Sequence, residues 1–220
     1  MLDGESSRSS QRFACSAGAS RTSAATGPEL AIWAGVMRAV HRLIEQRVVT
    51  NGEAVAILDR NRSWTYRELN SAANAVARRL MANGFRRGMC ADVRMAPAVD
   101  LAVILLAVLK AGGCYTWTND TASSLAVTAD GGSAPLVVLH SIAVDSVCGG
   151  PNLPVLSRET DIACVLHGSV AVPHATIASM ASCAAAGQSP WCGEQGAFDL
   201  WAALLSGATA VVTTRSAVAA

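Results

Sequence analysis

Short apolar, β-branched runs alternate with helix-length segments along most of the chain, and this alternation most strongly limits its fold. The strand-like runs are 54–58, 90–95, 136–140, 162–166 and 208–213. The helical segments are one that starts at Leu30, then 65–84, 98–111, 175–186 and 199–206. Strands that alternate with helices form parallel βαβ units, and continuously apolar strands are typical of a sheet covered on both faces. The sequence therefore predicts an α/β fold with a mainly parallel sheet flanked by helices.

Residues at the ends of two segments support these helices. Thr65 and Glu68 match a capping box, in which the hydroxyl and the carboxylate satisfy free backbone amides at a helix start. Gly84 follows the last apolar residue of that helix, as a C-terminal stop. Lys110 lies in the last turn of the 98–111 helix, where a cation complements the helix dipole, and Gly112 follows it. The 65–84 helix is expected to bury Leu69, Ala73, Val76 and Leu80.

The charge pattern excludes two classes of partner. Charged residues make up 15% of the chain, against about 25% in a typical soluble domain, and the net charge is +1. Basic and acidic residues are interspersed, so there is no basic face of the kind that binds nucleic acid. No apolar run reaches the ~18 residues of a membrane span. We therefore expect a cytoplasmic chain with no nucleic-acid partner and no membrane partner.

The cysteines show no ligand pattern. Seven are scattered along the chain, and no two of them have C-x-x-C spacing. The odd number and the spacing argue against a disulfide framework and against a zinc site. Several lie in apolar runs, where a free thiol packs as a small hydrophobic group. The sequence predicts no metal site and no bound cofactor; a protein built on thiol or metal chemistry is the least favoured interpretation, which a metal assay would test.

The first part of the chain differs in composition from the rest. Residues 1–27 are rich in Ser, Ala, Arg and Gly and contain few side chains to bury. Such a composition is typical of disorder. We expect residues 1–27 to be disordered and residues 28–220 to form the α/β domain.

Three segments, in order, resemble one enzyme family. Residues 64–70, WTYRELN, resemble the opening of the large subdomain of adenylate-forming enzymes. Residues 107–115, AVLKAGGCY, resemble the L-K-A-G-x-x-Y helix end of nonribosomal peptide synthetase adenylation domains. Residues 201–209, WAALLSGAT, are similar to the W-x-A-L-L-x-G-A-T segment of the same domains. The resemblance implies part of the N-terminal large subdomain of an adenylate-forming, AMP-binding enzyme.

The resemblance fails at the phosphate loop. The family carries T-S-G-[ST]-T-G-x-P-K-G after a strand, and the amides and hydroxyls of this loop hold the nucleotide phosphates. Here the matching strand, 161–166, is followed by His167, Gly168 and Ser169, and residues 170–174 already resemble the segment after the loop. Gly168 and Ser169 are therefore the vestige of the phosphate-loop position. The sequence predicts that they do not hold a triphosphate.

Two further family features have no counterpart in the sequence. The family's C-terminal subdomain supplies a catalytic lysine, whereas Lys110 is the only lysine here and aligns with the helix-end lysine. The chain also ends at Ala220, before the family's Y-G-P-T-E segment and its ribose-binding aspartate. We expect a truncated domain that has no catalytic residue and forms no acyl-adenylate.

One residue is a candidate for substrate binding. Alignment from Trp201 places Glu194 where the family has the aspartate that binds a substrate amino group, and Asp199 where it has a glutamate. A carboxylate there could pair with an ammonium group. The simpler interpretation, which we favour, is a polar loop before a helix with Asp199 near its N-terminus. Trp117 replaces a small residue or proline of the family, and we expect it to pack.

These features favour a non-catalytic adenylation-like domain that acts as a structural or docking scaffold in a nonribosomal peptide synthetase, with another adenylation domain charging the carrier in trans. The partners that the resemblance implies are condensation or cyclisation, carrier-protein and tailoring domains. Exposed apolar surface is expected where such partners pack. The alternative is half of a split ATP-dependent amino-acid adenylating enzyme that a second chain completes.

Overall fold

The computed structural model describes residues 38–60, 62–118, 149–166, 170–179, 187–191 and 197–213, and the backbone of 124–128 and 137–139. The candidate residues Gly168, Ser169 and Glu194, and the segment expected to be disordered, 1–27, lie outside these ranges.

The described elements follow one another largely as the sequence predicts. The helices are α2 (Val40–Asn51), α3 (Tyr66–Ala82), α4 (Val99–Lys110), α5 (His174–Ser179) and α6 (Phe198–Ser206). The strands are β1 (Val55–Asp59), β2 (Arg62–Thr65), β3 (Cys90–Arg94), β4 (Cys114–Thr118), β5 (Ser124–Thr128), β6 (Val137–Leu139), β7 (Ile162–Leu166), β8 (Val170–Pro173), β9 (Gln188–Trp191) and β10 (Thr209–Val212). The sequence analysis missed β2, β4, β5, β8 and β9, which are short and carry no long apolar run.

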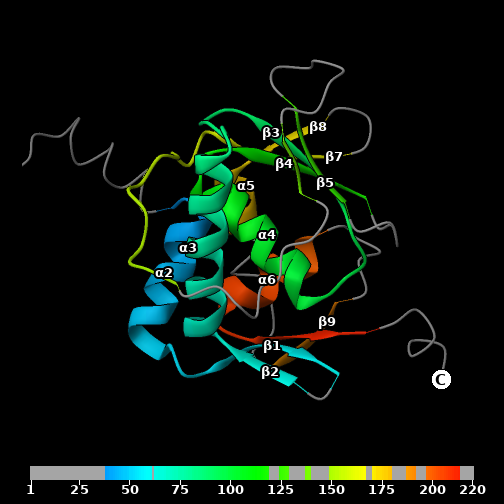
Figure 1. The fold of residues 1–220 in the computed structure, drawn as a ribbon. Coiled ribbons are helices and arrows are strands. Elements are labelled where there is room, and N and C mark those ends of the chain that lie inside the picture. Colours follow the sequence, from blue (N-terminus) through cyan, green and yellow to red (C-terminus); the bar gives the residue numbers. More distant parts are fainter. Residues whose placement is uncertain are drawn as a thin grey trace, which may run out of the picture.

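The strands form two sheets with helices between them (Figure 1). One sheet has the order β2-β1-β10-β9 and the other β6-β5-β3-β4-β7-β8. The centre of each is parallel: β1, β10 and β9 in the first, and β3, β4 and β7 in the second. The remaining described pairings are antiparallel. Three of them, β1 with β2, β5 with β6 and β7 with β8, join chain neighbours whose connections are too short for a crossover helix. The α/β prediction is confirmed, but the sheets are mixed.

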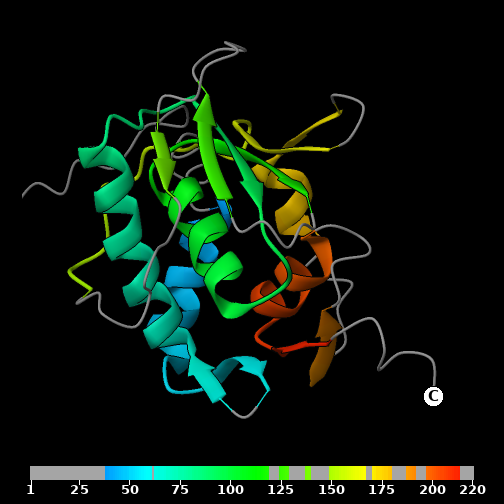
Figure 2. The same cartoon turned by 45° about the vertical axis from the view of Figure 1, so that its right-hand side comes forward.

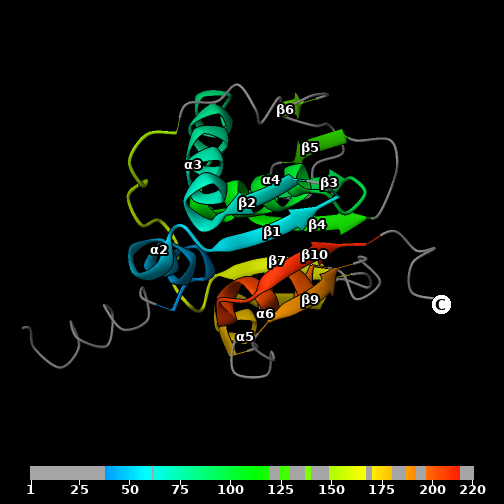
Figure 3. The same cartoon turned by 90° about the horizontal axis from the view of Figure 1, so that it is seen from below.

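Helix α4 is the centre of the helical layer. Every residue from Leu101 to Lys110 is at most 2% exposed. Helix α3 packs along α4, while α2 contacts both of them and also α5 and α6 (Figures 1 and 2). Seen from below, α5 and α6 lie on the same side of the strands β1 and β10 (Figure 3). A helix that is apolar on all sides is stable in water only when it is enclosed in this way.

Helix α3 has the ends that the sequence predicts. The amide of Glu68 donates to Thr65 Oγ1 at 3.1 Å, and the amide of Thr65 donates to Glu68 Oε2 at 2.8 Å. The helix stops at Ala82, and Gly84 has a φ of 97°, which a side chain would disfavour. The four residues expected in the core, Leu69, Ala73, Val76 and Leu80, are all buried. Val40 and Ile44, two residues of the first predicted helix, are buried in α2.

The second sheet differs from the prediction in how it is covered. Along β3, Ala91 and Val93 are buried, whereas Cys90 and Asp92 are half-buried and Arg94 is exposed. Successive side chains of a strand point to opposite faces. One face of β3 therefore packs on the helices, and the other carries polar groups and thiols.

The expected exposed apolar surface is not found among the described residues. There the large apolar side chains that are exposed are Val49, Ile162 and Val170, which come from three different elements. The helical layer between the sheets instead buries most of the apolar residues. None of the described helices is both long enough and apolar enough to cross a membrane.

A buried ion pair joins α2 to α4. Lys110 Nζ donates to Glu45 Oε1 at 2.5 Å, and neither side chain is more than 5% exposed. The other carboxylate oxygen of Glu45 accepts a bond of 2.7 Å from Arg42. Burial lowers the pKa of Lys110, although the Glu45 carboxylate partly opposes this. Lys110 is thus held by a specific partner rather than by the helix dipole alone.

Two buried histidines lie beside this pair. The rings of His41 and His174 are 6.0 Å apart, and His174 Nδ1 accepts a bond of 3.2 Å from the amide of Val40. Burial lowers the pKa of His174 to about 4, against a weaker opposing effect of Asp161. Burial also lowers the pKa of His41 well below its usual value, with smaller contributions from His174 when it is protonated and from Lys110 and Arg42. Both rings are neutral in the folded chain at pH 7.

Glu45→Gln should destabilise the fold by about 3 kcal/mol, because it leaves the Lys110 ammonium buried without an opposite charge. Chemical denaturation of the purified chain measures this change. Glu53→Gln is the matched control, since Glu53 pairs with Arg67 on the surface, where both side chains are at least 60% exposed; its effect should stay below about 1 kcal/mol. Lys110→Met added to Glu45→Gln should recover most of the loss. An equal effect of the two glutamate changes would contradict this assignment.

Stability should also fall as the solution is acidified from neutral pH. In the unfolded chain each histidine binds a proton near pH 6.5, about its ordinary pKa, whereas the folded chain keeps both neutral to lower pH. The unfolded state therefore binds more protons, and the free energy of unfolding should fall by up to about 1.4 kcal/mol per pH unit for His174 between about pH 6 and pH 5. Denaturation curves over this range give the slope.

His174→Asn is the control for the pH dependence. Its amide oxygen can still accept the bond from Val40, but it does not titrate. The variant should have a shallower slope than the wild type. Parallel curves for the two proteins would show that His174 is not responsible.

Candidate functional site

The carboxyl ends of β4 and β7 form the edge at which a parallel α/β sheet binds ligands. The two strands pair in parallel, with Tyr115 opposite Cys164. In the sequence, the candidate residues Gly168 and Ser169 directly follow β7, and Glu194 precedes α6. Their own positions lie outside the described residues.

The described residues at this edge enclose little space. A cavity of about 20 Å³ lies there, lined by Tyr115, Trp117, Cys164, Val165, Leu166, Ala197 and Phe198. A ligand pocket usually has about 300 to 1,000 Å³, and a single water needs about 10 to 15 Å³. This cavity has room for one water and is far too small for an amino acid or a nucleotide.

Aromatic side chains fill the edge. Trp201 Nε1 donates to the hydroxyl of Tyr115 at 2.6 Å. Burial raises the pKa of Tyr115 well above its usual value, so this phenol stays neutral and is not a base. Trp117 Nε1 donates to the carbonyl of Met95 at 2.8 Å, and its ring lies 6.4 Å from that of Trp191. Trp117 therefore packs, as the sequence analysis expects.

The first turn of α6 carries the second acidic residue of the sequence analysis. Asp199 is half-buried there, and burial raises the pKa of its carboxyl group. The described part of the chain gives it no basic partner. Asp199 thus lies near a helix N-terminus, as expected, rather than in an ion pair.

The connection between β7 and β8 carries the most information about nucleotide chemistry. These strands form an antiparallel hairpin whose last pair is Leu166 and Val170. Only residues 167–169 join them, and β8 leads directly into α5. The sequence analysis expected a strand joined to a helix, whereas the chain first turns back as β8. The short connection itself was recognised correctly from the sequence.

The lysine does not contribute to this edge. Lys110 lies at the C-terminal end of α4, and its ammonium group is fully buried against Glu45. Among the residues that the structure describes, there is also no group of three or more His, Cys, Asp and Glu side chains that could hold a metal ion.

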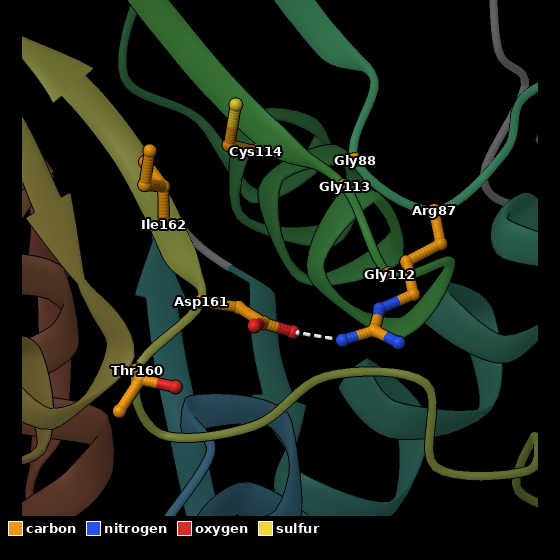
Figure 4. A pocket seen from close by; sticks show the side chains of 8 residues that line it. All are labelled: Arg87, Gly88, Gly112, Gly113, Cys114, Thr160, Asp161 and Ile162. Carbon is orange, nitrogen blue, oxygen red and sulfur yellow. Dashed lines mark hydrogen bonds and ion pairs between the residues drawn. The ribbon is translucent and has the colours of Figure 1, made fainter.

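A second cavity lies at the opposite ends of the same strands, where β4 begins with Cys114 and β7 with Ile162. Its volume is about 530 Å³, and it is lined by Arg87, Gly88, Gly112, Gly113, Cys114, Thr160, Asp161 and Ile162 (Figure 4). Arg87 donates to Asp161 at 2.8 Å across it. Burial opposes ionisation of Asp161, but a backbone bond from Arg158 and the Arg87 guanidinium outweigh it and lower the pKa. The sequence analysis missed this cavity, because loops distant in sequence form it.

Comparison with known proteins agrees with the fold. Residues 44–148 match the family model described as AMP-binding enzyme. The chain is 37% identical over 78 residues to tyrocidine synthase 1 of Brevibacillus parabrevis, and 39% identical over 77 residues to surfactin synthase subunit 2 of Bacillus subtilis. These matches cover 36% and 35% of this chain. Zwittermicin A synthase ZmaJ of Bacillus cereus is 26% identical over 149 residues, which cover 59% of this chain.

The chain spans only a small part of these relatives: 7% of tyrocidine synthase 1, 2% of surfactin synthase subunit 2 and 28% of zwittermicin A synthase ZmaJ. Among solved structures, the Klebsiella oxytoca NpsA N-terminal subdomain in complex with anthranilyl-AMSN is 21% identical with a TM-score of 0.67. The match covers 81% of this chain and 54% of that one. A Mycobacterium tuberculosis fatty acyl CoA synthetase has the same fold, with 14% identity, a TM-score of 0.64 and coverage of 81% and 45%. These matches support a partial adenylation domain of the adenylate-forming superfamily.

Proposed function

We propose that this chain is a non-catalytic adenylation-like domain that serves as a structural and docking unit of a nonribosomal peptide synthetase in the cytoplasm. Another adenylation domain would charge the carrier protein in trans. The observation that carries the proposal is the three-residue connection between β7 and β8.

This connection is too short for a phosphate loop. Triphosphate binding uses a run of backbone amides that converge on the phosphate oxygens, usually from a glycine-rich loop. Because Leu166 and Val170 are paired across the hairpin, residues 167–169 must reverse the chain direction. Three residues also supply no more than three backbone amides, fewer than a glycine-rich phosphate loop offers. Gly168 and Ser169 therefore do not form a nucleotide site.

The remaining charges do not compensate for the missing loop. A cation near the phosphates would have to come from an arginine, since Lys110 is buried against Glu45. Arg94, at the carboxyl end of β3, pairs with Asp92 at 3.0 Å. Together with the cavity of about 20 Å³ at this edge, these contacts favour a domain that binds neither nucleotide nor amino acid, and Glu194 has no substrate role in this proposal.

The rest of the domain supports a structural role. The capping box of α3, the buried α4 and the parallel centres of both sheets are intact. Tyr66 also joins α3 to the end of α6, because its hydroxyl lies 3.0 Å from the carbonyl of Leu204 and 2.9 Å from that of Ala208. A domain with this packing can hold neighbouring domains in position without doing chemistry. Since relatives are multidomain synthetases, the proposed partners are condensation or cyclisation, carrier-protein and tailoring domains.

Calorimetric titration of ATP and Mg²⁺ into the purified chain tests the loss of the phosphate site. We expect no binding heat, because the amides and the lysine that hold the phosphates are missing. A complete adenylation domain with its full loop is the positive control under the same conditions. Saturable binding by this chain would overturn the non-catalytic assignment.

The same titration with the neighbouring synthetase domains present distinguishes the split-enzyme alternative. If a second chain completed an enzyme, the mixture would bind ATP and catalyse amino-acid-dependent exchange of pyrophosphate into ATP. We expect neither. Size-exclusion chromatography with light scattering then tests docking: a complex with a neighbouring domain supports it, and a chain that stays monomeric with each of these domains contradicts it.

A further inference from the structure

Two of the cysteines that are far apart in the sequence lie side by side in the second sheet. Cys90 and Cys114 are the first residues of β3 and β4, and they are directly paired in the parallel register. Neighbouring strands lie about 4.7 to 4.9 Å apart. A disulfide joins Cα atoms about 4.4 to 6.8 Å apart. The register therefore places this pair within the Cα separation that a disulfide bond spans.

The two thiols are on the accessible side of the sheet. Cys90 and Cys114 are both half-buried, whereas their chain neighbours Ala91 and Tyr115 are buried against the helices. Cys114 also lines the cavity of about 530 Å³, as does Ile162 of the adjacent strand (Figure 4). This volume lies in the range that admits a small organic ligand. A small disulfide can thus reach the sulfur of Cys114.

We propose that Cys90 and Cys114 form a redox-active dithiol, which reacts with low-molecular-weight disulfides in this cavity and closes to a disulfide between β3 and β4. The proposal does not depend on the proposed function above. It assigns Cys114 as the attacking residue and Cys90 as the resolving residue.

The position of the two thiols supports these roles, because Cys114 lines the cavity and Cys90 does not. The neighbouring Cys90 thiol lowers the pKa of Cys114, against the effect of burial. The Cys114 thiol, together with burial and the nearby Asp92, raises the pKa of Cys90. Because the thiolate is the nucleophile in exchange, Cys114 reacts first.

The reaction balances in two steps. The Cys114 thiolate attacks one sulfur of the external disulfide, so a mixed disulfide forms and one small thiol leaves. Cys114 then carries no negative charge, and the main cause that keeps Cys90 protonated is removed. Cys90 loses its proton to solvent and attacks the Cys114 sulfur, which expels the second small thiol. Two protein thiols are oxidised, and one external disulfide is reduced to two thiols.

Cys164 provides a matched control on the adjacent strand. It is buried and paired with Tyr115, which points to the other face of the sheet from Cys114. Burial raises the pKa of the Cys164 thiol to about 11. Cys164→Ser should therefore leave the reaction unchanged.

The test is incubation of the full chain with oxidised glutathione, followed by alkylation of the remaining thiols and peptide mass mapping. Cleavage after Arg, Lys and aromatic residues separates Cys90, in peptide 88–94, from Cys114, in peptide 111–115, and keeps both apart from Cys148. We expect these two peptides to be linked, with the loss of two hydrogen atoms. Reduction should restore both free peptides.

Two variants test the order of the steps. Cys90→Ser should stop at a glutathionyl group on Cys114, whereas Cys114→Ser should leave Cys90 unmodified over the same time. Circular dichroism checks that each variant is folded. The unmodified chain gives an independent measurement: limiting iodoacetamide should alkylate Cys114 about tenfold faster than Cys90 or Cys164.

The proposal fails if both peptides of the wild-type chain carry only the alkylating group after oxidation, or if Cys164→Ser removes the link. Equal alkylation rates of Cys90 and Cys114, or glutathionylation of Cys90 in Cys114→Ser, would overturn the assigned roles.

Discussion

Burial of α4 is the constraint on which the rest of the structure depends. A helix with no polar face must be enclosed, so α2, α3 and the second sheet pack around it. Its last residue, Lys110, is then removed from water and requires an anion, which Glu45 of α2 provides at 2.5 Å. The buried histidines beside this pair are neutral for the same reason. The single lysine of the chain is thereby a structural residue, which leaves the ligand edge without a lysine.

The packing contacts of the domain are complete, whereas the connection at its ligand edge is short, and this difference bears on the role of the domain. The contacts that hold the layers together are complete, including the capping box of α3 and the bonds of the Tyr66 hydroxyl. The hairpin of β7 and β8, in contrast, is closed by residues 167–169 alone. Packing and phosphate binding use different residues of this fold, so one can be kept when the other is absent.

In the second sheet, the space at the carboxyl ends of β4 and β7 differs from the space at their amino ends. At the carboxyl ends of β4 and β7, aromatic side chains leave space for about one water, whereas at their amino ends a cavity of about 530 Å³ is open beside Cys114. The predicted interface of exposed apolar residues is missing from the described surface, because most of the described apolar residues are buried in and around the helical layer. Among the described residues, the paired thiols Cys90 and Cys114 thus lie at the end of the sheet that the family resemblance did not indicate.

The sequence by itself determined the α/β class, the extent of α3 and α4, and the short connection after β7, because these follow from local patterns: apolar periodicity, the Thr65–Glu68 capping box and the order of family motifs. It did not determine the two mixed sheets, since strand pairing joins segments distant in the chain and short strands such as β8 carry little pattern. Only the tertiary structure paired Lys110 with Glu45 and placed Cys90 opposite Cys114. These contacts depend on register between separate elements, which spacing along the chain does not encode.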